Sequence, residues 1–282
     1  MEKTSYHIHT LFCDGKSTPE EFVKAALKES YTSIGFSSHC MFPFSDLWHL
    51  DPKRINEYLN YIRNISVQMK ENGIPISVYA GFEADFIPEL VKEDFSDYRG
   101  FSPDYIIGAV HFVKPGKKIF AVDDSVEIVK KESGAVSLEK KNTVLDYYSR
   151  LREMIKKASF DVLAHFDLVK VHNNVLELFD ENDSWYREEV EKTIEFLKQS
   201  GKICEINTGG IGRGKISELY PSQWIINLMF QAGVPVTLST DSHNAAGLSA
   251  GRDSGLEGIV SAGYKEIMII RDGVWVPCSL GD

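Results

Sequence analysis

The sequence lacks long apolar runs and closely spaced cysteines. Among its 282 residues, no apolar segment approaches the roughly 20 residues that a membrane-spanning helix needs. Its four cysteines, Cys13, Cys40, Cys204 and Cys278, form no C-x-x-C pair, which argues against a disulfide framework and against a zinc knuckle. The N-terminus has neither the basic stretch nor the apolar run of a secretory signal. We therefore expect a cytoplasmic protein with no membrane partner.

Positive charge is also scarce. The formal net charge is −10, which disfavours a nucleic-acid partner because a polyanion binds to basic surfaces. A small phosphorylated substrate is still compatible with this charge, because bound metal ions can invert the local field. An apolar fraction of 43% is ordinary for a globular protein, and the length suits a single domain over residues 1–282. The sequence leaves the oligomeric state open.

Short apolar segments alternate with longer amphipathic segments, a pattern typical of β–α–β units and a parallel sheet. The expected strands span residues 5–9, 33–38, 76–83, 105–111, 161–165, 203–207 and 236–240. The expected helices span residues 19–30, 51–72, 142–158, 184–200, 222–232 and 254–262. An Asp-Gly turn at 272–273 predicts a terminal hairpin. Two longer stretches, 84–103 and 112–141, are expected to be irregular loops beside a ligand site.

Six of the eight histidines lie at or just after the end of an expected strand. Carboxylates occupy the same position at two strand ends. In parallel α/β folds this edge of the sheet collects ligands and catalytic groups. One histidine so placed is more often an ordinary hydrogen-bonded residue, and we assign that role to His49 and His172. The six strand-end histidines and the two carboxylates together form a repeated pattern that packing alone does not explain. They are His7, His9, His39, Glu83, His111, His165, Asp241 and His243.

The spacing of the first two histidines favours metal binding. His7 and His9 are two residues apart on a strand, so both side chains face the same side. Imidazole and carboxylate donors together suit zinc, iron, manganese or cobalt better than calcium. The sequence therefore predicts a metal-dependent hydrolase with its site at the carboxyl ends of the strands.

Seven ordered segments resemble the polymerase-and-histidinol-phosphatase (PHP) superfamily, and most closely its monofunctional histidinol-phosphate phosphatases. They are His-Ile-His-Thr at 7–10 with Asp14 after it, Ser-Ser-His at 37–39, Gly-Phe-Glu at 81–83, Ala-Val-His-Phe-Val at 109–113, Ala-His-Phe-Asp-Leu-Val-Lys at 164–170, Glu-Ile-Asn-Thr at 205–208 and Ser-Thr-Asp-Ser-His at 239–243. Two positions depart from the family's pattern. Ser38 stands where aspartate is usual, and Ser242 stands where alanine is favoured.

The resemblance implies a distorted, TIM-like barrel of seven βα units with three divalent transition-metal ions, which would be zinc, manganese or iron. His7, His9, Glu83 and Asp241 would hold the first ion. Glu83 would bridge to a second ion completed by His111 and His165, and Asp14, His39 and His243 would hold the third. The implied reaction is hydrolysis of L-histidinol phosphate in histidine biosynthesis, with Glu83, Asp14 and Arg213 as the catalytic residues.

A phosphate-binding element is expected after the sixth strand. The glycine-rich loop 209–214 permits close backbone approach, and Arg213 offers a planar fork that matches phosphate oxygens. Tyr220 is a second candidate for substrate binding, and Arg252 is an alternative anion partner. Around the mouth, aromatic and acidic side chains could recognise an imidazole and an amine: Phe42, Phe44, Asp46, Trp48, Asp85, Phe86 and Phe112.

Other functions remain open at this point. An amidohydrolase-type barrel also begins with His-x-His, although it typically needs a carboxylated lysine where this chain has Glu83. A PHP phosphoesterase acting on another small phosphate ester or a nucleotide is a second alternative, and a non-catalytic module of the same fold is a third. A cysteine phosphatase is disfavoured, because neither Cys13 nor Cys40 lies in a C-x5-R loop.

Overall fold

The computed structural model describes residues 2–40, 42, 48–134 and 137–281. Its centre is a seven-stranded parallel sheet in which the strands follow one another in chain order. These strands are β1 (Thr4–Ser5), β2 (Ser33–Cys40), β3 (Ser77–Asp85), β4 (Tyr105–Ala109), β7 (Val162–Leu163), β8 (Ile203–Asn207) and β9 (Val236–Ser239). Beyond β1 and β9, a parallel bridge joins Ile8 to Ser242, and the His9 amide donates to the Ser242 carbonyl at 2.9 Å. The sheet thus curls into a nearly closed barrel, which confirms the predicted fold class.

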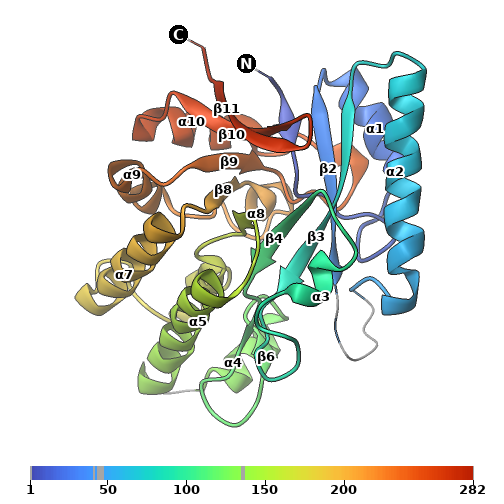
Figure 1. The fold of residues 1–282 in the computed structure, drawn as a ribbon. Helices are drawn as coiled ribbons and strands as arrows, with labels where there is room; N and C mark the ends of the chain where they lie inside the picture. Colours follow the sequence, from blue (N-terminus) through green and yellow to red (C-terminus); the bar gives the residue numbers. More distant parts are fainter. Residues whose placement is uncertain (1, 41, 43–47, 135–136, 282) are drawn as a thin grey trace.

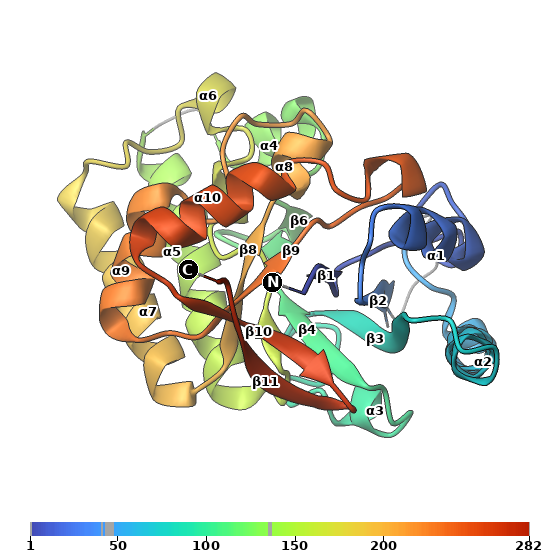
Figure 2. The same cartoon turned by 90° about the horizontal axis from the view of Figure 1, so that it is seen from above.

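Amphipathic helices follow the strands and cover the outside of the barrel (Figures 1 and 2). The longer ones are α1 (Pro19–Lys28), α2 (Ile55–Glu71), α5 (Ser137–Lys157), α7 (Ser184–Ser200), α9 (Gln223–Ala232) and α10 (Arg252–Ala262). The short ones are α3 (Ser96–Arg99), α4 (Val126–Glu132), α6 (Asn173–Leu176) and α8 (Gly209–Gly212), with the 3-10 turns η1 (Pro52–Arg54), η2 (Leu168–Lys170) and η3 (Ala245–Gly247). None of the helices in the described ranges is long and apolar enough to cross a bilayer.

The start of α1 illustrates how local chemistry sets a helix boundary. The Thr18 hydroxyl accepts from the Glu21 amide, while the Glu21 carboxylate accepts from the Thr18 amide. This capping box satisfies two backbone donors that a helix leaves without partners. Pro19 supplies the first helical residue, as the sequence predicts. On its inner face the helix buries Phe22 and Val23.

A terminal hairpin covers the amino ends of the barrel strands (Figure 1). Strand β10 (Glu266–Arg271) pairs antiparallel with β11 (Val274–Ser279). Asp272 and Gly273 at the turn both have positive φ, the geometry that a tight primed turn requires. The Tyr6 hydroxyl, at the start of the barrel, accepts from the Ile270 amide at 2.8 Å, and its ring packs 5.2 Å from Trp275. With this end covered, the carboxyl ends of the strands form the open end.

Three strands stop at least two residues before their predicted carboxyl ends. Strands β1, β4 and β7 stop two to four residues before the predicted ends at His9, His111 and His165. The backbone departs from the sheet hydrogen-bond pattern there, because groups outside the sheet bind its amides and carbonyls. The His111 carbonyl accepts from the Val122 amide, and the His165 amide donates to the Glu205 carboxylate. Polar side chains and local turns replace sheet hydrogen bonds at this edge.

The stretches predicted as irregular contain regular elements. Residues 84–103 include α3, and residues 112–141 include a small hairpin of β5 (Phe112–Val113) and β6 (Phe120–Ala121), followed by α4 and the start of α5. The glycine-rich loop forms the one-turn helix α8. Here the prediction failed because short elements are stabilised by tertiary contacts more than by residue propensity.

Candidate metal centre

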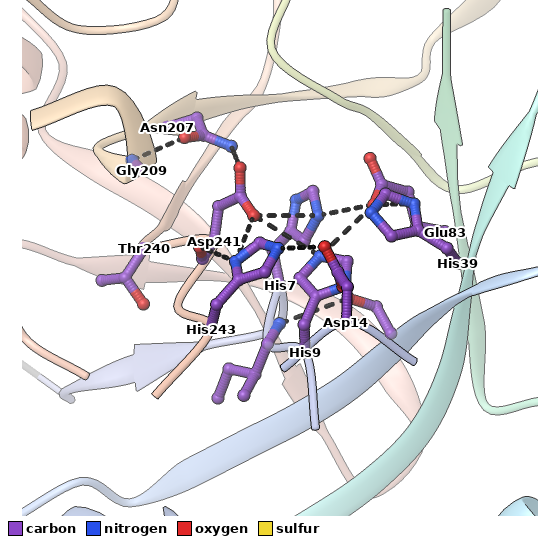
Figure 3. A network of polar contacts seen from close by, with 12 residues as sticks. His7, His9, Asp14, His39, Glu83, Asn207, Gly209, Thr240, Asp241 and His243 are labelled. Atoms are coloured by element: carbon purple, nitrogen blue, oxygen red, sulfur yellow. Dashed lines mark hydrogen bonds and ion pairs between the residues drawn. The ribbon is translucent and has the colours of Figure 1, made fainter. Parts of the chain in front are cut away.

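The strand ends bring all nine proposed ligands to the open end of the barrel. Four groups of side chains have ligand atoms within 4.8 Å of one another. These groups are His7/His9/Asp241, Glu83/His111/His165, His9/Asp14/His39/His243 and His39/Asp85/His111. The first three correspond closely to the sets implied by the resemblance. Together the nine residues form what we call the histidine–carboxylate cluster, seen in part in Figure 3.

Glu83 lies at the centre of this cluster, because its two carboxylate oxygens face different histidines. Its Oε2 lies 3.1 Å from His7 Nε2 and 3.3 Å from His9 Nε2. Its Oε1 lies 3.0 Å from His165 Nε2 and 3.5 Å from His111 Nε2. A carboxylate placed in this way can bridge two cations, one on each side.

Several buried atoms of the cluster lie close to one another but make no hydrogen bond of proper geometry among the described residues. They are His7 Nε2, His9 Nε2, Asp14 Oδ1, His39 Nδ1 and Glu83 Oε2. Buried polar atoms normally have partners, because an unsatisfied group costs about 1–3 kcal/mol. All five are lone-pair donors of the kind that bind zinc, manganese or iron. The residues present therefore fit a group of transition-metal ions.

Two carboxylates outside the proposed ligand set orient the histidines. Glu205 on β8 accepts from His7 Nδ1, with its two oxygens 3.1 and 3.0 Å away. Asp85 on β3 accepts from His111 Nδ1 at 2.6 Å. A ligating histidine usually donates its second ring nitrogen to such a partner, which fixes the tautomer and the ring orientation. Both imidazoles thereby keep Nε2 directed into the cluster.

No role for Glu205 follows from the sequence pattern, and Asp85 is predicted only as a residue of the rim. A usable signal was present, because alternate residues of a strand face the same side. Asp85 is two residues after Glu83, and Glu205 is two residues before the buried Asn207. At Ser38, no carboxylate among the described residues is hydrogen-bonded to the serine hydroxyl. The Ser38 hydroxyl is buried without a partner, while His39 Nδ1 faces Glu83 Oε2 at 2.9 Å.

The charges in the cluster depend strongly on one another. Burial by itself would raise the pKa of Glu83, but the imidazoles of His39, His7 and His111 lower this pKa well below its usual range. Burial opposes protonation of His7, yet Glu205 and Glu83 raise the pKa of its imidazole well above the usual value. The carboxylates thus attract positive charge, which either protons or metal ions can supply. Metal binding would displace those protons.

Backbone conformation directs the last two ligands. Asp241 follows β9 with φ of 48°, a left-handed conformation that aspartate tolerates better than most residues. This turn lets Asp241 Oδ1 approach His9 Nε2 at 3.4 Å and lets His243 Nε2 approach Asp14 Oδ2 at 3.0 Å (Figure 3). Gly209 lies alongside, and a Cβ there would come within 2.8 Å of the Asp241 side chain. Only glycine allows the α8 turn to approach this closely.

The α8 turn places Arg213 in the site. Its Nη2 donates to Asp241 Oδ2 at 3.0 Å, and its Nε donates to the Gly209 carbonyl at 3.3 Å. Arg213 lines a cavity of about 390 Å³ together with Glu83, His111 and other members of the cluster. A guanidinium has five N–H donors, so donors remain for a ligand after these two contacts.

The other two candidates for anion binding lie elsewhere. Tyr220 is 1% exposed and is not among the described residues that line the cavity. Its backbone forms an antiparallel bridge with Asn207, and its ring packs against the Cα of Gly210. Arg252 donates to the Thr4 carbonyl at 2.8 Å and lies over the Tyr31 ring. Both residues lie in the barrel wall outside the described cavity lining, so their contact with substrate stays a prediction.

The expected aromatic rim is only partly present. Trp48 lines the cavity, with its ring 4.8 Å from His39 and stacked on Phe112 at 5.8 Å. Phe42 packs against Trp48 in the same group, at 4.8 Å. Phe86 is fully buried in the core, so its expected place at the rim is wrong. Phe44 and Asp46 fall outside the described residues.

Comparisons with known proteins agree with this geometry. The PHP domain family matches residues 5–209 of the chain. The histidinol-phosphatase of Bacillus subtilis is 28% identical over 272 residues, which cover 91% of this chain and 99% of that protein.

Two solved structures share the fold. The hisK protein of Listeria monocytogenes has a TM-score of 0.76 at 18% identity, covering 89% of this chain and 99% of that one. The second is the histidinol phosphate phosphatase of Lactococcus lactis, complexed with zinc, L-histidinol and phosphate. It has a TM-score of 0.71 at 20% identity and covers 98% of this chain and 99% of that one. The family match spans more than half of the 282 residues of this chain and includes most of the cluster. This chain therefore belongs to the PHP domain family.

Proposed function

We propose that this chain is a metal-dependent histidinol-phosphatase, which hydrolyses L-histidinol phosphate to L-histidinol and inorganic phosphate in histidine biosynthesis. The observation that carries the proposal is the Glu83-centred cluster with Arg213 in the wall of the same cavity. A cavity of about 390 Å³ suits a small phosphate ester. The relative from Bacillus subtilis is itself named histidinol-phosphatase, and it aligns along nearly all of its length.

Three divalent ions are proposed for the cluster, held by the three ligand sets described above. Ions held there would lower the pKa of bound water towards about 7 and offset charge on the phosphoryl group. Zinc is the first candidate, because the Lactococcus lactis relative was solved with zinc. Manganese and iron suit the same donors.

The metal content can be tested directly. We expect two to three equivalents of zinc, iron or manganese per chain after purification without chelators, because the cluster offers more ligands than one ion can use. Elemental analysis measures this number. Dialysis against a chelator should abolish phosphatase activity, and adding back the ion should restore it. A metal-free protein with full activity would contradict the proposal.

The protein's own residues would bind and orient the phosphoryl group. The free N–H groups of Arg213 would bind phosphate oxygens, while Asp241 holds the guanidinium in place through its 3.0 Å contact. Glu83 would contribute one oxygen beside His7 and His9 and the other beside His111 and His165. Asp14, whose Oδ2 contacts His243, would hold the third ion beside the phosphoryl group.

Substrate preference tests the function itself. Histidinol phosphate should exceed a plain alkyl phosphate and a nucleoside monophosphate in kcat/KM by at least roughly 100-fold, or about 2.7 kcal/mol. The physical reason is that the phosphate-binding groups accept any monoester, so discrimination must come from the rest of the cavity. Steady-state phosphate release with each ester measures this preference. A preference for the nucleotide would retain the metal chemistry and overturn the proposed substrate.

A further inference from the structure

Among the described residues that line the cavity, three charged side chains besides Arg213 lie outside the cluster: Asp123, Asp124 and Lys215. Asp123 and Lys215 both line the cavity, and Lys215 Nζ lies 3.9 Å from Asp123 Oδ2. They come from different parts of the fold. Asp123 follows strand β6, and Lys215 follows the α8 turn that carries Arg213. Their charges therefore face the space in which a substrate of this enzyme would bind.

Backbone hydrogen bonds hold both residues beside the site. The Val122 amide donates to the carbonyl of His111 at 2.8 Å, so Asp123 follows directly after a contact with a proposed ligand. The Lys215 amide donates to the Gly210 carbonyl at 2.9 Å at the end of α8. The positions of Asp123 and Lys215 are thus set by the same elements that place His111 and Arg213.

Asp123 is an available carboxylate in this wall. Burial would raise its pKa, but His111, Lys215 and Arg213 lower the pKa, so the group is an anion at neutral pH. Asp85 is already engaged by His111, and the Asp124 carboxylate accepts from the Ser125 amide at 2.6 Å. Lys215 and Asp123 are 35% and 24% exposed, and a pair at 3.9 Å is too long for a hydrogen bond. An incoming ligand can therefore separate the two charges at little cost.

The proposed substrate carries a matching pair of charges. In L-histidinol phosphate, the ammonium group lies on the carbon next to the CH2–O–P ester, so cation and phosphate are only a few bonds apart. We propose, resting on the histidinol-phosphatase function above, that Asp123 binds the substrate ammonium while Lys215 turns to the phosphate beside Arg213. Asp123 then selects 2-aminoalkyl phosphates as the substrate class. The ion pair of the free enzyme is exchanged for two ion pairs with the substrate.

The test compares histidinol phosphate with its des-amino analogue, 3-(imidazol-4-yl)propyl phosphate, which keeps the ring and the ester. Asp123→Asn should lower kcat/KM for histidinol phosphate by about 30-fold, mainly through KM, the range for losing one charged hydrogen bond. For the des-amino analogue, the same variant should stay within about 3-fold of wild type. Asp123→Glu should recover part of the loss. Asp253→Asn serves as the control, because Asp253 is exposed on α10 and is not among the described residues that line the cavity, and it should leave both substrates nearly unchanged.

Each other outcome has a distinct meaning. If Asp123→Asn slows both esters equally while its metal content is normal, the ammonium assignment is wrong and the proposed function stands. An equal loss in Asp253→Asn would also overturn the assignment to Asp123. If the wild-type protein does not prefer histidinol phosphate over simple esters at all, the proposed function itself fails.

Discussion

Replacing Glu83 with glutamine should lower kcat/KM by at least about 1,000-fold, or about 4 kcal/mol. Its two oxygens face His7 and His9 on one side and His111 and His165 on the other, so this one group would serve two ions. A neutral amide bridges cations poorly and cannot offset their charge. Elemental analysis should show fewer ions per chain, and circular dichroism should show the wild-type fold.

Variants of His7, His9 and Glu205 serve as comparisons for the Glu83 variant. Replacing His7 or His9 alone should cost less, because each histidine serves one proposed ion. Glu205→Gln removes a charge that supports His7 without facing the ions, and we expect a loss of about 10–100-fold in metal affinity. If Glu83→Gln retained full metal content and lost no more activity than Glu205→Gln, the bridging role would be refuted.

Arg213→Ala should cost about 2–4 kcal/mol of transition-state stabilisation, the range for removing one preorganised donor of this kind. Arg213 lines the cavity, and Asp241 and the Gly209 carbonyl hold its guanidinium. Metal content should not change, because arginine is not a metal ligand. Arg213→Lys should recover little, since an ammonium lacks the planar fork.

The matched control for Arg213 is Arg271→Ala on the terminal hairpin, where the side chain is 52% exposed and pairs with Glu2. This variant should retain wild-type activity. A loss of metal in Arg213→Ala, or unchanged activity, would contradict the phosphate-binding assignment. Arg252 would not then be the next candidate, because it is bound to the Thr4 carbonyl in the barrel wall. Lys215 would be the better alternative, since it lines the same cavity.

The parallel sheet and the location of its site could be predicted from the sequence, because both follow from local periodicity, whereas the closed barrel was implied by the resemblance to the PHP superfamily. Strand β8 and helix α7 have the predicted bounds, and helix α1 begins at the predicted residue, Pro19. Parallel strands place their carboxyl ends at one edge, so residues that end successive strands must meet. Short apolar segments followed by His39, Glu83 or Asp241 were sufficient to predict a shared site, although those residues are far apart in the chain.

The tertiary structure decided what surrounds that site. Hydrophobic periodicity predicts which face of a strand a residue occupies. It does not predict the direction in which a side chain on a loop points. Arg213, Tyr220 and Arg252 were all candidates for binding phosphate, and only the folded chain places Arg213 in the cavity and the other two in the wall. The pairing of Glu205 with His7 joins residues 198 positions apart. Likewise, Asp123 and Lys215 meet only because the β6 and α8 segments converge at the barrel mouth. These contacts depend on packing between distant segments, which no local pattern specifies.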